Sequence, residues 1–198
     1  MELDQEVKLP KYGDFVIDLE ETPPEYIWNS VFTKRGNQRN EIRKLEKEGV
    51  VFSFMWNNLG DELAAFVELY RRTVERAGGT PRPFDFFSRR YRSGEFVIFL
   101  AKREEKLIGG IGLSVCEKRH TMEILAAPYD QADKDHNEIN LFDYWKAFQW
   151  AAQNGIRWVN LGTTLADPAD GIHRFKKQFR GRFRRKSFAS VWIRAMSK

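Results

Sequence analysis

Cysteine is nearly absent from this 198-residue sequence, and it contains no long apolar run. The single cysteine, Cys116, provides neither a disulfide framework nor a cysteine-based zinc site. Because Cys116 lies in an apolar stretch, we interpret it as a small core residue and not as a catalytic thiol. No segment approaches the roughly 20 apolar residues of a transmembrane helix. We therefore expect a fold without disulfides, a bound metal or a transmembrane segment.

We expect no secretory signal peptide in the opening residues of this sequence. The opening residues, MELDQEVKLPKYGD, are polar and acidic, whereas a signal peptide has a basic region followed by an apolar one. With 42% hydrophobic residues, a chain of 198 residues can bury one sizeable core. We expect a cytoplasmic protein with an N-terminal extension over residues 1–22 and a single domain over residues 23–198.

Acidic side chains are missing from residues 174–186, the most basic part of the sequence. This stretch carries eight lysines and arginines, which exceed the net charge of +5, so the remaining sequence is net acidic. Phe175, Phe179 and Phe183 recur every fourth residue, a spacing that places three anchoring rings on one helical face. A solvated basic face is the alternative interpretation. We favour a site for a polyanion or a carbonyl group, because solubility alone does not require eight cations without one acid.

A predicted buried strand precedes this basic stretch. It ends at Gly162, Thr163 and Thr164, and the two threonines are able to donate hydrogen bonds there. Turn-forming residues follow, and then a short helix or turn is expected over residues 172–179. This turn would bring Lys176 back toward the end of the strand.

The remaining hydrophobic patterns predict an alternation of helices and strands. Helices are expected over residues 24–32, 35–48, 58–77, 84–91 and 140–154, and strands over residues 15–19, 50–56, 96–101, 107–115, 121–127 and 189–193. Asn140 is expected to cap the last of these helices. Three meandering strands, followed by a helical crossover to another strand, indicate an α+β sandwich.

This element order resembles that of the GNAT acyltransferase fold, which implies a mixed sheet flanked by helices. Enzymes of that fold commonly hold the pyrophosphate of coenzyme A in a glycine-containing loop before a helix. The corresponding stretch here, YDQADKDHNEIN, contains no glycine. The sequence therefore gives no direct sign of acetyl-coenzyme A.

Four segments resemble, in the same order, the FemAB-like transferases with a BioF2-like domain. They are RNEIRKLEKEGV, PRPFDFF, NLFDYWKAFQWAAQNGIRWVNLGTT and GIHRFKKQF, and the resemblance covers residues 28–183. Members of the family add amino acids from aminoacyl-tRNA to peptidoglycan precursors or act as other acyltransferases. The resemblance is to the second of their two GNAT-like domains. It implies an N-acyltransferase that uses an aminoacyl-tRNA or acyl thioester as co-substrate, binds no cofactor tightly and acts on an amine.

The resemblance also implies roles for individual residues. Lys176 matches the lysine of a Phe-Lys motif that is expected to face the acyl carbonyl or a substrate phosphate, and we take it as the candidate catalytic residue. Arg39 and Arg43 match arginines of an entry helix, Asn140 matches a capping asparagine, and Gly162 matches a glycine at a strand end. The full set of expected substrate-binding residues is Arg39, Arg43, Tyr129, Asn140, Gly162, Thr163, Thr164, His173, Arg174 and Phe175.

Some positions depart from the family pattern or leave the chemistry open. His173, Asn160 and Arg180 stand where the family often has tyrosine, aspartate and glycine. Tyr129 either lines the acyl pocket or covers it. The general base stays open among Glu123, Asp130, Asp143 and His173, with substrate or solvent as further acceptors of the proton.

A different class of function is a non-catalytic basic module that holds RNA or another polyanion on the same fold. A plain interaction domain is a further alternative. An acyltransferase consumes a donor, whereas a binding module shows salt-dependent affinity without turnover. Because two-domain relatives pair two GNAT-like units, we also expect a homodimer or a pairing with another GNAT-like chain, and tRNA is a candidate partner.

Overall fold

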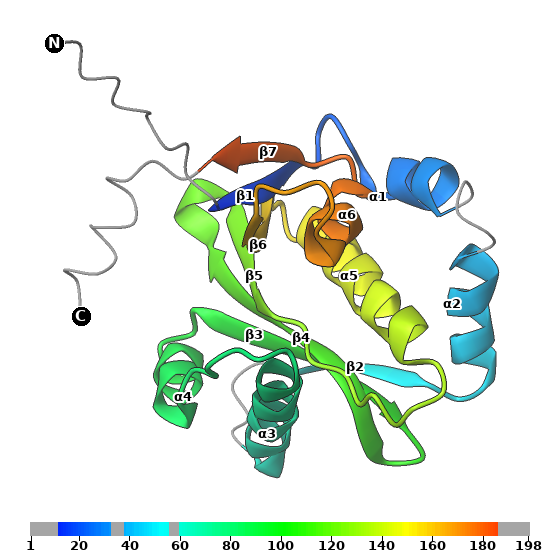
Figure 1. Ribbon diagram of the computed structural model, residues 1–198, viewed down its shortest axis with the longest axis vertical. Helices are drawn as coiled ribbons and strands as arrows, with labels where there is room; N and C mark the ends of the chain where they lie inside the picture. The colour runs from blue at the N-terminus through cyan, green and yellow to red at the C-terminus, as the bar shows by residue number, and fades with distance from the viewer. Residues whose placement is uncertain (1–11, 33–37, 56–59, 186–198) are drawn as a thin grey trace, which may run out of the picture.

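The computed structural model describes residues 12–32, 38–55 and 60–185. They form a seven-stranded sheet in the order β2-β3-β4-β5-β6-β1-β7, with helices on both faces (Figure 1). The strands are β1 (Tyr12–Asp18), β2 (Val51–Met55), β3 (Phe96–Arg103), β4 (Lys106–Cys116), β5 (Thr121–Ala126), β6 (Trp158–Leu165) and β7 (Arg182–Arg185). The helices are α1 (Pro24–Tyr26), the π-helical η1 (Ile27–Val31), α2 (Gln38–Lys47), α3 (Asp61–Arg76), α4 (Phe84–Arg92), the 3-10 turn η2 (Glu117–Arg119), α5 (His136–Gln153) and α6 (Gly171–Lys177). The expected α+β architecture is confirmed.

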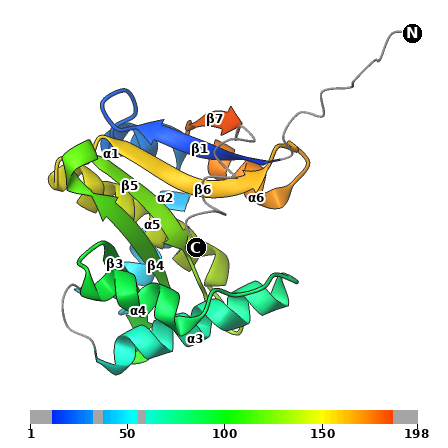
Figure 2. The ribbon, with the colours of Figure 1, turned by 90° about the vertical axis from the view of Figure 1, so that its left-hand side faces the viewer.

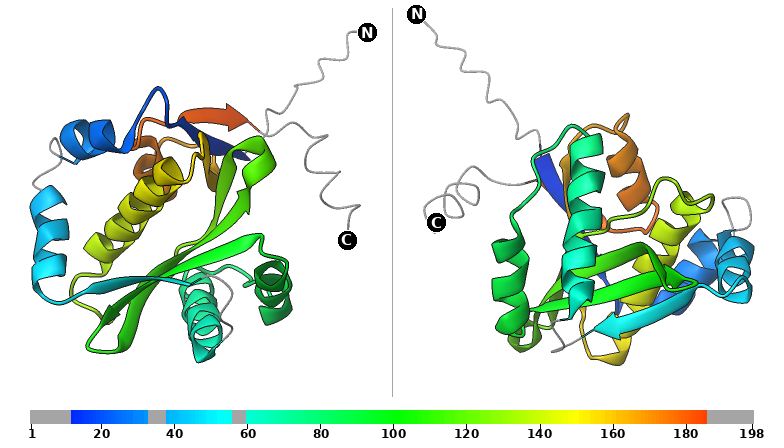
Figure 3. Two further views of the ribbon diagram at one scale, coloured as in Figure 1. Left: turned by 180° about the vertical axis from the view of Figure 1, so that it is seen from behind. Right: turned by 90° about the horizontal axis from the view of Figure 1, so that it is seen from below.

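The sheet lies between two layers of helices, as neighbouring residues of the inner strand β4 show. A side chain at Gly109 would collide with Ile139 of α5, whereas one at Gly110 would lie 3.3 Å from Phe66 of α3. Because successive residues of a strand point to opposite faces, α5 and α3 cover opposite faces of the sheet. Helices α2 and α6 lie on the side of α5, and α4 lies beside α3 (Figure 3).

Large aromatic side chains fill both layers. The cluster beneath α5 includes Phe142, Phe148 and Phe179, and a smaller cluster beneath α3 and α4 includes Phe66 and Phe87. Burying each of these rings contributes about 1.5–3 kcal/mol relative to exposure. The ring centre of Phe179 lies 5.4 Å from that of Tyr144 and 5.2 Å from that of Phe148. This packing holds the segment after α6 against α5.

The sheet opens between β5 and β6. These strands are parallel, and their pairing runs only from Thr121 opposite Trp158 to Glu123 opposite Asn160. Beyond these residues β5 stays paired with β4 and β6 stays paired with β1, so the two strands diverge toward their carboxyl ends (Figure 2). In open α/β sheets, ligands bind at such carboxyl ends where neighbouring strands part.

The structure corrects several local expectations. Cys116 is exposed, because it is the last residue of β4 and pairs with Thr121 at the tip of a hairpin. Asn140 does not cap α5, because the helix begins at His136 and Asp135 occupies the N-cap position. Phe183 lies on β7 and therefore does not share a helical face with the other two phenylalanines.

The N-terminal stretch contributes to the sheet. Strand β1, within the extension expected over residues 1–22, lies between β6 and β7 and pairs with both. The strand predicted over residues 189–193 lies outside the described residues, as does Lys186.

Candidate active site

Lys176 reaches the opening between β5 and β6 from helix α6. The residue is only 7% exposed, and its Nζ donates a hydrogen bond of 3.0 Å to the carbonyl oxygen of Thr163. A Cβ atom added to Gly162 would lie 3.5 Å from this nitrogen and 3.0 Å from the carbonyl oxygen of Ile124 on β5. The ammonium group, β6 and the end of β5 therefore converge at one point.

Gly162 allows the backbone to make this approach. Its φ of +81° lies in the left-handed region, which glycine adopts without strain. The N–H of Gly162 donates a 2.8 Å hydrogen bond to Oδ1 of Asn160, two residues earlier on the strand. Asn160 thus supports the backbone bend.

Helix α6 is too short to hold its position by helix propensity alone, and polar contacts at its start fix it. Asp170 caps the helix: its Oδ1 accepts from the N–H of His173 at 2.7 Å and from Oγ1 of Thr164 at 3.2 Å. The Nδ1 of His173 lies 2.9 Å from the carbonyl oxygen of Leu165, and its ring packs at 4.9 Å against Phe15. His173 is therefore placed to hold α6 against the end of β6.

The two threonines are engaged with carboxylates. The hydroxyl of Thr163 donates to Oδ1 of Asp14 on β1 at 2.9 Å, while that of Thr164 bonds Asp170. The two side chains thus hold β6 to β1 and to the start of α6. The backbone carbonyl group of Thr163 is the part that positions Lys176.

Two cavities lie on the outer faces of α6. The basic cavity, of about 590 Å³, lies between α6, η1 and the turn before β7, and its charged lining consists of Arg174, Lys177 and Arg180. The polar cavity, of about 460 Å³, lies between α2, α5 and α6 and is lined by Asn140, Arg174 and Phe175 among others. Three of the predicted substrate-binding residues thus share the polar cavity, and Arg174 lines both.

Other predicted residues lie on neighbouring or separate surfaces. Arg39 bonds Asn29 at 3.4 Å, and the guanidinium of Arg43 lies 5.7 Å from the ring centre of Trp28, so both connect α2 to η1. Tyr129 packs elsewhere. Its ring centre lies 4.8 Å from the guanidinium of Arg76 on α3 and 5.8 Å from the ring centre of His136, so it packs between α3 and the start of α5.

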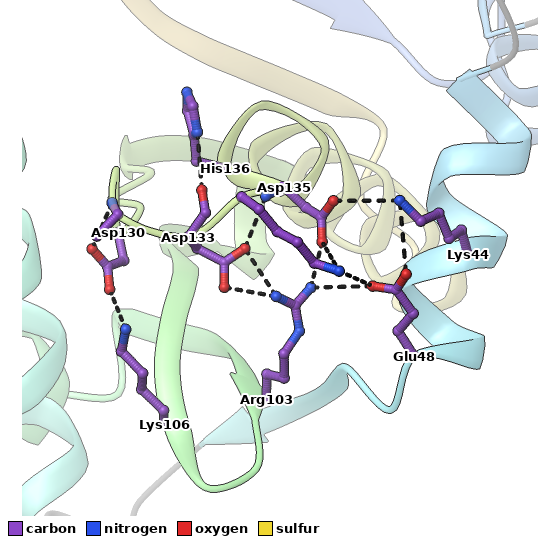
Figure 4. A network of polar contacts seen from close by, with 10 residues as sticks. Lys44, Glu48, Arg103, Lys106, Asp130, Asp133, Asp135 and His136 are labelled. Atoms are coloured by element: carbon purple, nitrogen blue, oxygen red, sulfur yellow. Dashed lines mark hydrogen bonds and ion pairs between the residues drawn. The ribbon is translucent and has the colours of Figure 1, made fainter.

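The loop before α5 is occupied by ion pairs (Figure 4). Arg103 bonds Asp133 at 2.8 Å and Asp135 at 2.6 Å, and Lys44 lies 3.6 Å from Asp135. Burial raises the pKa of Asp135, but the hydrogen bond from Arg103 and the charge of Lys44 outweigh it, so the pKa is lowered overall. The positive end of the α5 dipole therefore faces carboxylates of its own loop. A helix N-terminus is in general a favourable site for an anion, and here the carboxylates of the loop take that place.

The acid and base candidates differ in their surroundings. The hydrogen bond from Lys106, 2.8 Å away, holds the pKa of Asp130 below its ordinary value, which makes it a weak base. Asp143 is fully buried, and this burial raises its pKa well above the ordinary 3.8. Neither residue lines the two cavities. Glu123 lies on β5 opposite Asn160, at the last paired position before the strands part.

Sequence reasoning missed several groups at the site. The carbonyl group of Ile124 belongs to the backbone, so the residue type gives no hint of its place in the site. Asp14 accepts a hydrogen bond from Thr163 only because β1 pairs with β6. Gln38, Glu41 and Glu138 line the polar cavity, although their spacing in the sequence resembles that of any solvated helix face. The entry-helix motif was the signal that pointed to α2.

A mixed sheet that opens between two parallel strands, with helices on both faces, defines a GNAT-type acyltransferase fold. The acetyltransferase (GNAT) domain family matches residues 33–177, and the chain belongs to this family. Among curated proteins, no similar sequence was found.

Solved structures share this fold at low sequence identity. FemX superposes with a TM-score of 0.69 at 15% identity, covering 93% of this chain and 62% of FemX. L-PGS from Bacillus licheniformis superposes with a TM-score of 0.62 at 17% identity, covering 95% of this chain and 64% of L-PGS. The C-terminal domain of a proposed lysylphosphatidylglycerol synthetase from Agrobacterium fabrum gives 0.63 at 12% identity, covering 94% and 64%. The chain thus spans less than two thirds of these neighbours, which are FemAB-like GNAT-type proteins.

Proposed function

We propose that this protein is an N-acyltransferase of the FemAB-like type, which transfers an aminoacyl or acyl group to an amine. The observation that carries the proposal is the buried ammonium group of Lys176 at the carboxyl ends of β5 and β6. Membership of the GNAT family supports acyl transfer. The likeness to FemX and to a lysylphosphatidylglycerol synthetase domain favours an aminoacyl donor.

The reaction requires an amine nitrogen to attack the carbonyl carbon of an ester or thioester. A C–N bond forms, the carbonyl oxygen becomes an oxyanion, and the C–O or C–S bond then breaks. The amine loses a proton to a base or to solvent. A fixed ammonium group stabilises the oxyanion without having to reorient, which is the largest single contribution in many acyl transfers. Lys176 fits this role because the Thr163 carbonyl and the surrounding burial hold its side chain in place.

Two charged regions support a tRNA-linked donor over coenzyme A. The basic cavity provides Arg174, Lys177 and Arg180, which suit the phosphates of a nucleic acid. At the start of α5, the ion pairs of Asp133 and Asp135 with Arg103 already occupy the helix end where a pyrophosphate would bind. We therefore propose aminoacyl-tRNA as the donor, with an acyl thioester as the second candidate.

The experiment that tests this function compares donors directly. The protein is incubated with a mixture of charged tRNAs or with acetyl-coenzyme A, each with a primary-amine acceptor, and amide formation is followed by mass spectrometry. The proposal expects an amide product with charged tRNA. Salt-dependent binding of tRNA without product from either donor would instead support the non-catalytic polyanion-binding module.

A further inference from the structure

The polar cavity between α2, α5 and α6 has a lining unlike that of the basic cavity beside it. Four carboxamide side chains line it, together with the carboxylates of Glu41 and Glu138 and one cation, Arg174. Its volume of about 460 Å³ lies within the range of small-molecule sites. The lining is therefore rich in hydrogen-bonding amides, and its two negative charges outnumber its one positive charge.

Two of these carboxamides are incompletely hydrogen-bonded. Oε1 of Gln38 and Oδ1 of Asn140 are shielded from water and accept no hydrogen bond in the part of the chain that the structure describes. An unpaired buried amide oxygen costs free energy, because the water lost on burial is not replaced. Rotation of either carboxamide toward the cavity would offer its oxygen to a donor there. The two side chains come from different helices, α2 and α5.

The two carboxylates are not held by a close ion pair in the described ranges, although the pKa of Lys44 is raised by the charge of Glu48 and, more weakly, by that of Glu41. Neither Glu41 nor Glu138 forms an ion pair with any residue of the described ranges, although Glu46 and Glu48, also carried by the α2 segment, both do. Arg174 contributes the single positive charge at the α6 side of the cavity. A ligand that brings positive charge and N–H donors would satisfy the carboxylates and the unpaired amide oxygens together.

We propose that the polar cavity binds the primary ammonium group of a small ligand, with Glu41 and Glu138 as its charge partners and Gln38 and Asn140 as further acceptors. Phe175 lines this cavity, and the next residue, Lys176, faces the opening between β5 and β6. Helix α6 thus connects the two places. The link to acyl transfer rests on the proposed function, whereas binding of the ammonium group does not.

An ammonium group in this cavity has two possible sources. It can belong to the acceptor amine, or to the aminoacyl residue of the donor. The probes therefore fall into two arms: n-butylamine and 1,4-diaminobutane represent an alkyl amine, while L-alaninamide and L-lysinamide represent an aminoacyl group. Inorganic phosphate is the anionic comparison. Affinities are measured by titration calorimetry on the full chain, without any donor present.

The decisive variant is Glu41→Gln with Glu138→Gln, which removes both charges and keeps the side-chain volumes. The matched control is Glu95→Gln with Glu117→Gln, because both residues are exposed, lie outside the cavity and produce the same change in net charge. We expect the cavity variant to weaken ammonium binding by at least about tenfold, while the control stays within about twofold of the original. The arm that binds more tightly identifies the source of the ammonium group.

Three results would overturn the inference: no binding of any ammonium probe, equal weakening in the two double variants, or tighter binding of phosphate that the cavity variant leaves unchanged. Failure of this inference is separable from failure of the proposed function. Amide formation without ammonium binding in the cavity would refute only the inference. Specific ammonium binding without transfer from any donor would refute only the proposed function.

Discussion

The Nζ of Lys176 lies 3.0 Å from the carbonyl oxygen of Thr163, thirteen positions earlier in the chain. This contact joins a helix of seven residues to the end of a strand and keeps the lysine almost entirely buried. A lysine ammonium in such a place has lost much of its hydration, which costs free energy that the carbonyl partly offsets. A substrate that develops negative charge nearby would offset the remaining cost, because the ammonium group would stabilise that charge.

Gly162 provides the first test of how closely this site is built. Replacing Gly162 with alanine forces a β-carbon onto a φ of +81° and places it 3.0 Å from the carbonyl oxygen of Ile124. Gly49→Ala is the control, because its φ of +79° carries the same backbone penalty with no neighbouring atom within 4 Å. That penalty is about 1–2 kcal/mol in each variant. We expect Gly162→Ala to lose more stability than the control in chemical denaturation and to lose turnover as well. Equal losses of stability, with turnover retained in both, would contradict the crowding at this point.

The basic cavity predicts a distinct dependence on salt. The triple variant Arg174→Ser, Lys177→Ser and Arg180→Ser removes every charged group that lines it. If the cavity holds phosphates, the slope of log affinity for tRNA against log salt should become shallower by about two, because each neutralised phosphate of a single strand releases about 0.7 counterion.

The matched control for this experiment is the triple replacement of the arginines on β7. Arg182 is already paired with Glu21 at 2.6 Å, and Arg184 and Arg185 are exposed on the other side of the turn. We expect a smaller change of slope from this variant. A larger change here than in the cavity variant would move the anion site to β7.

Asp143 predicts how stability depends on pH. Burial raises the pKa of Asp143 in the folded state above the ordinary 3.8, so the folded protein holds this proton while the unfolded chain releases it. Stability from this group is therefore fully present below pH 3.8 and decreases as pH rises toward the folded pKa. Asp143→Asn is neutral in both states and should be more stable than the original protein at pH 7, by about 1.4 kcal/mol for each pH unit between 3.8 and the folded pKa or pH 7, whichever is lower.

This gain should disappear near pH 3, where both proteins are uncharged at the position. The measurement is urea denaturation of the two proteins at pH 3, 5 and 7. A variant that is less stable than the original at pH 7 would mean that Asp143 is ionised and partnered in the folded state.

Elements with a long and regular hydrophobic pattern were predictable from the sequence. Helix α3, with buried Leu63, Phe66 and Val67, matches its expectation closely, because one apolar stripe specifies both helix type and orientation. The β3–β4 hairpin is confirmed for a similar reason. Asn140 failed as a cap because hydrogen bonds from Arg103 hold the loop that ends at Asp135, five residues earlier, and no local pattern encodes a partner from a distant strand.

The candidate site was predictable in part. A motif indicated Lys176, and the turn after β6 indicated its return to the strand end, which the contact with Thr163 confirms. The left-handed conformation of Gly162 and the proximity of Ile124 depend on how far β5 and β6 diverge. That divergence follows from the pairing of β6 with β1, a long-range contact that the local sequence does not specify.

The most direct test of the account compares Lys176→Met with Lys177→Met, using the donor that proves active. Methionine retains the apolar stem, so Lys176→Met should fold, which thermal melting by circular dichroism verifies. We predict that kcat for Lys176→Met falls roughly a hundred- to a thousand-fold, the effect of losing one oxyanion-stabilising group, or about 2.7–4 kcal/mol. Lys177 is exposed and lines the basic cavity, so its variant should alter KM for a charged-tRNA donor and retain kcat. Small and equal effects on kcat in two folded variants would contradict a catalytic role for Lys176.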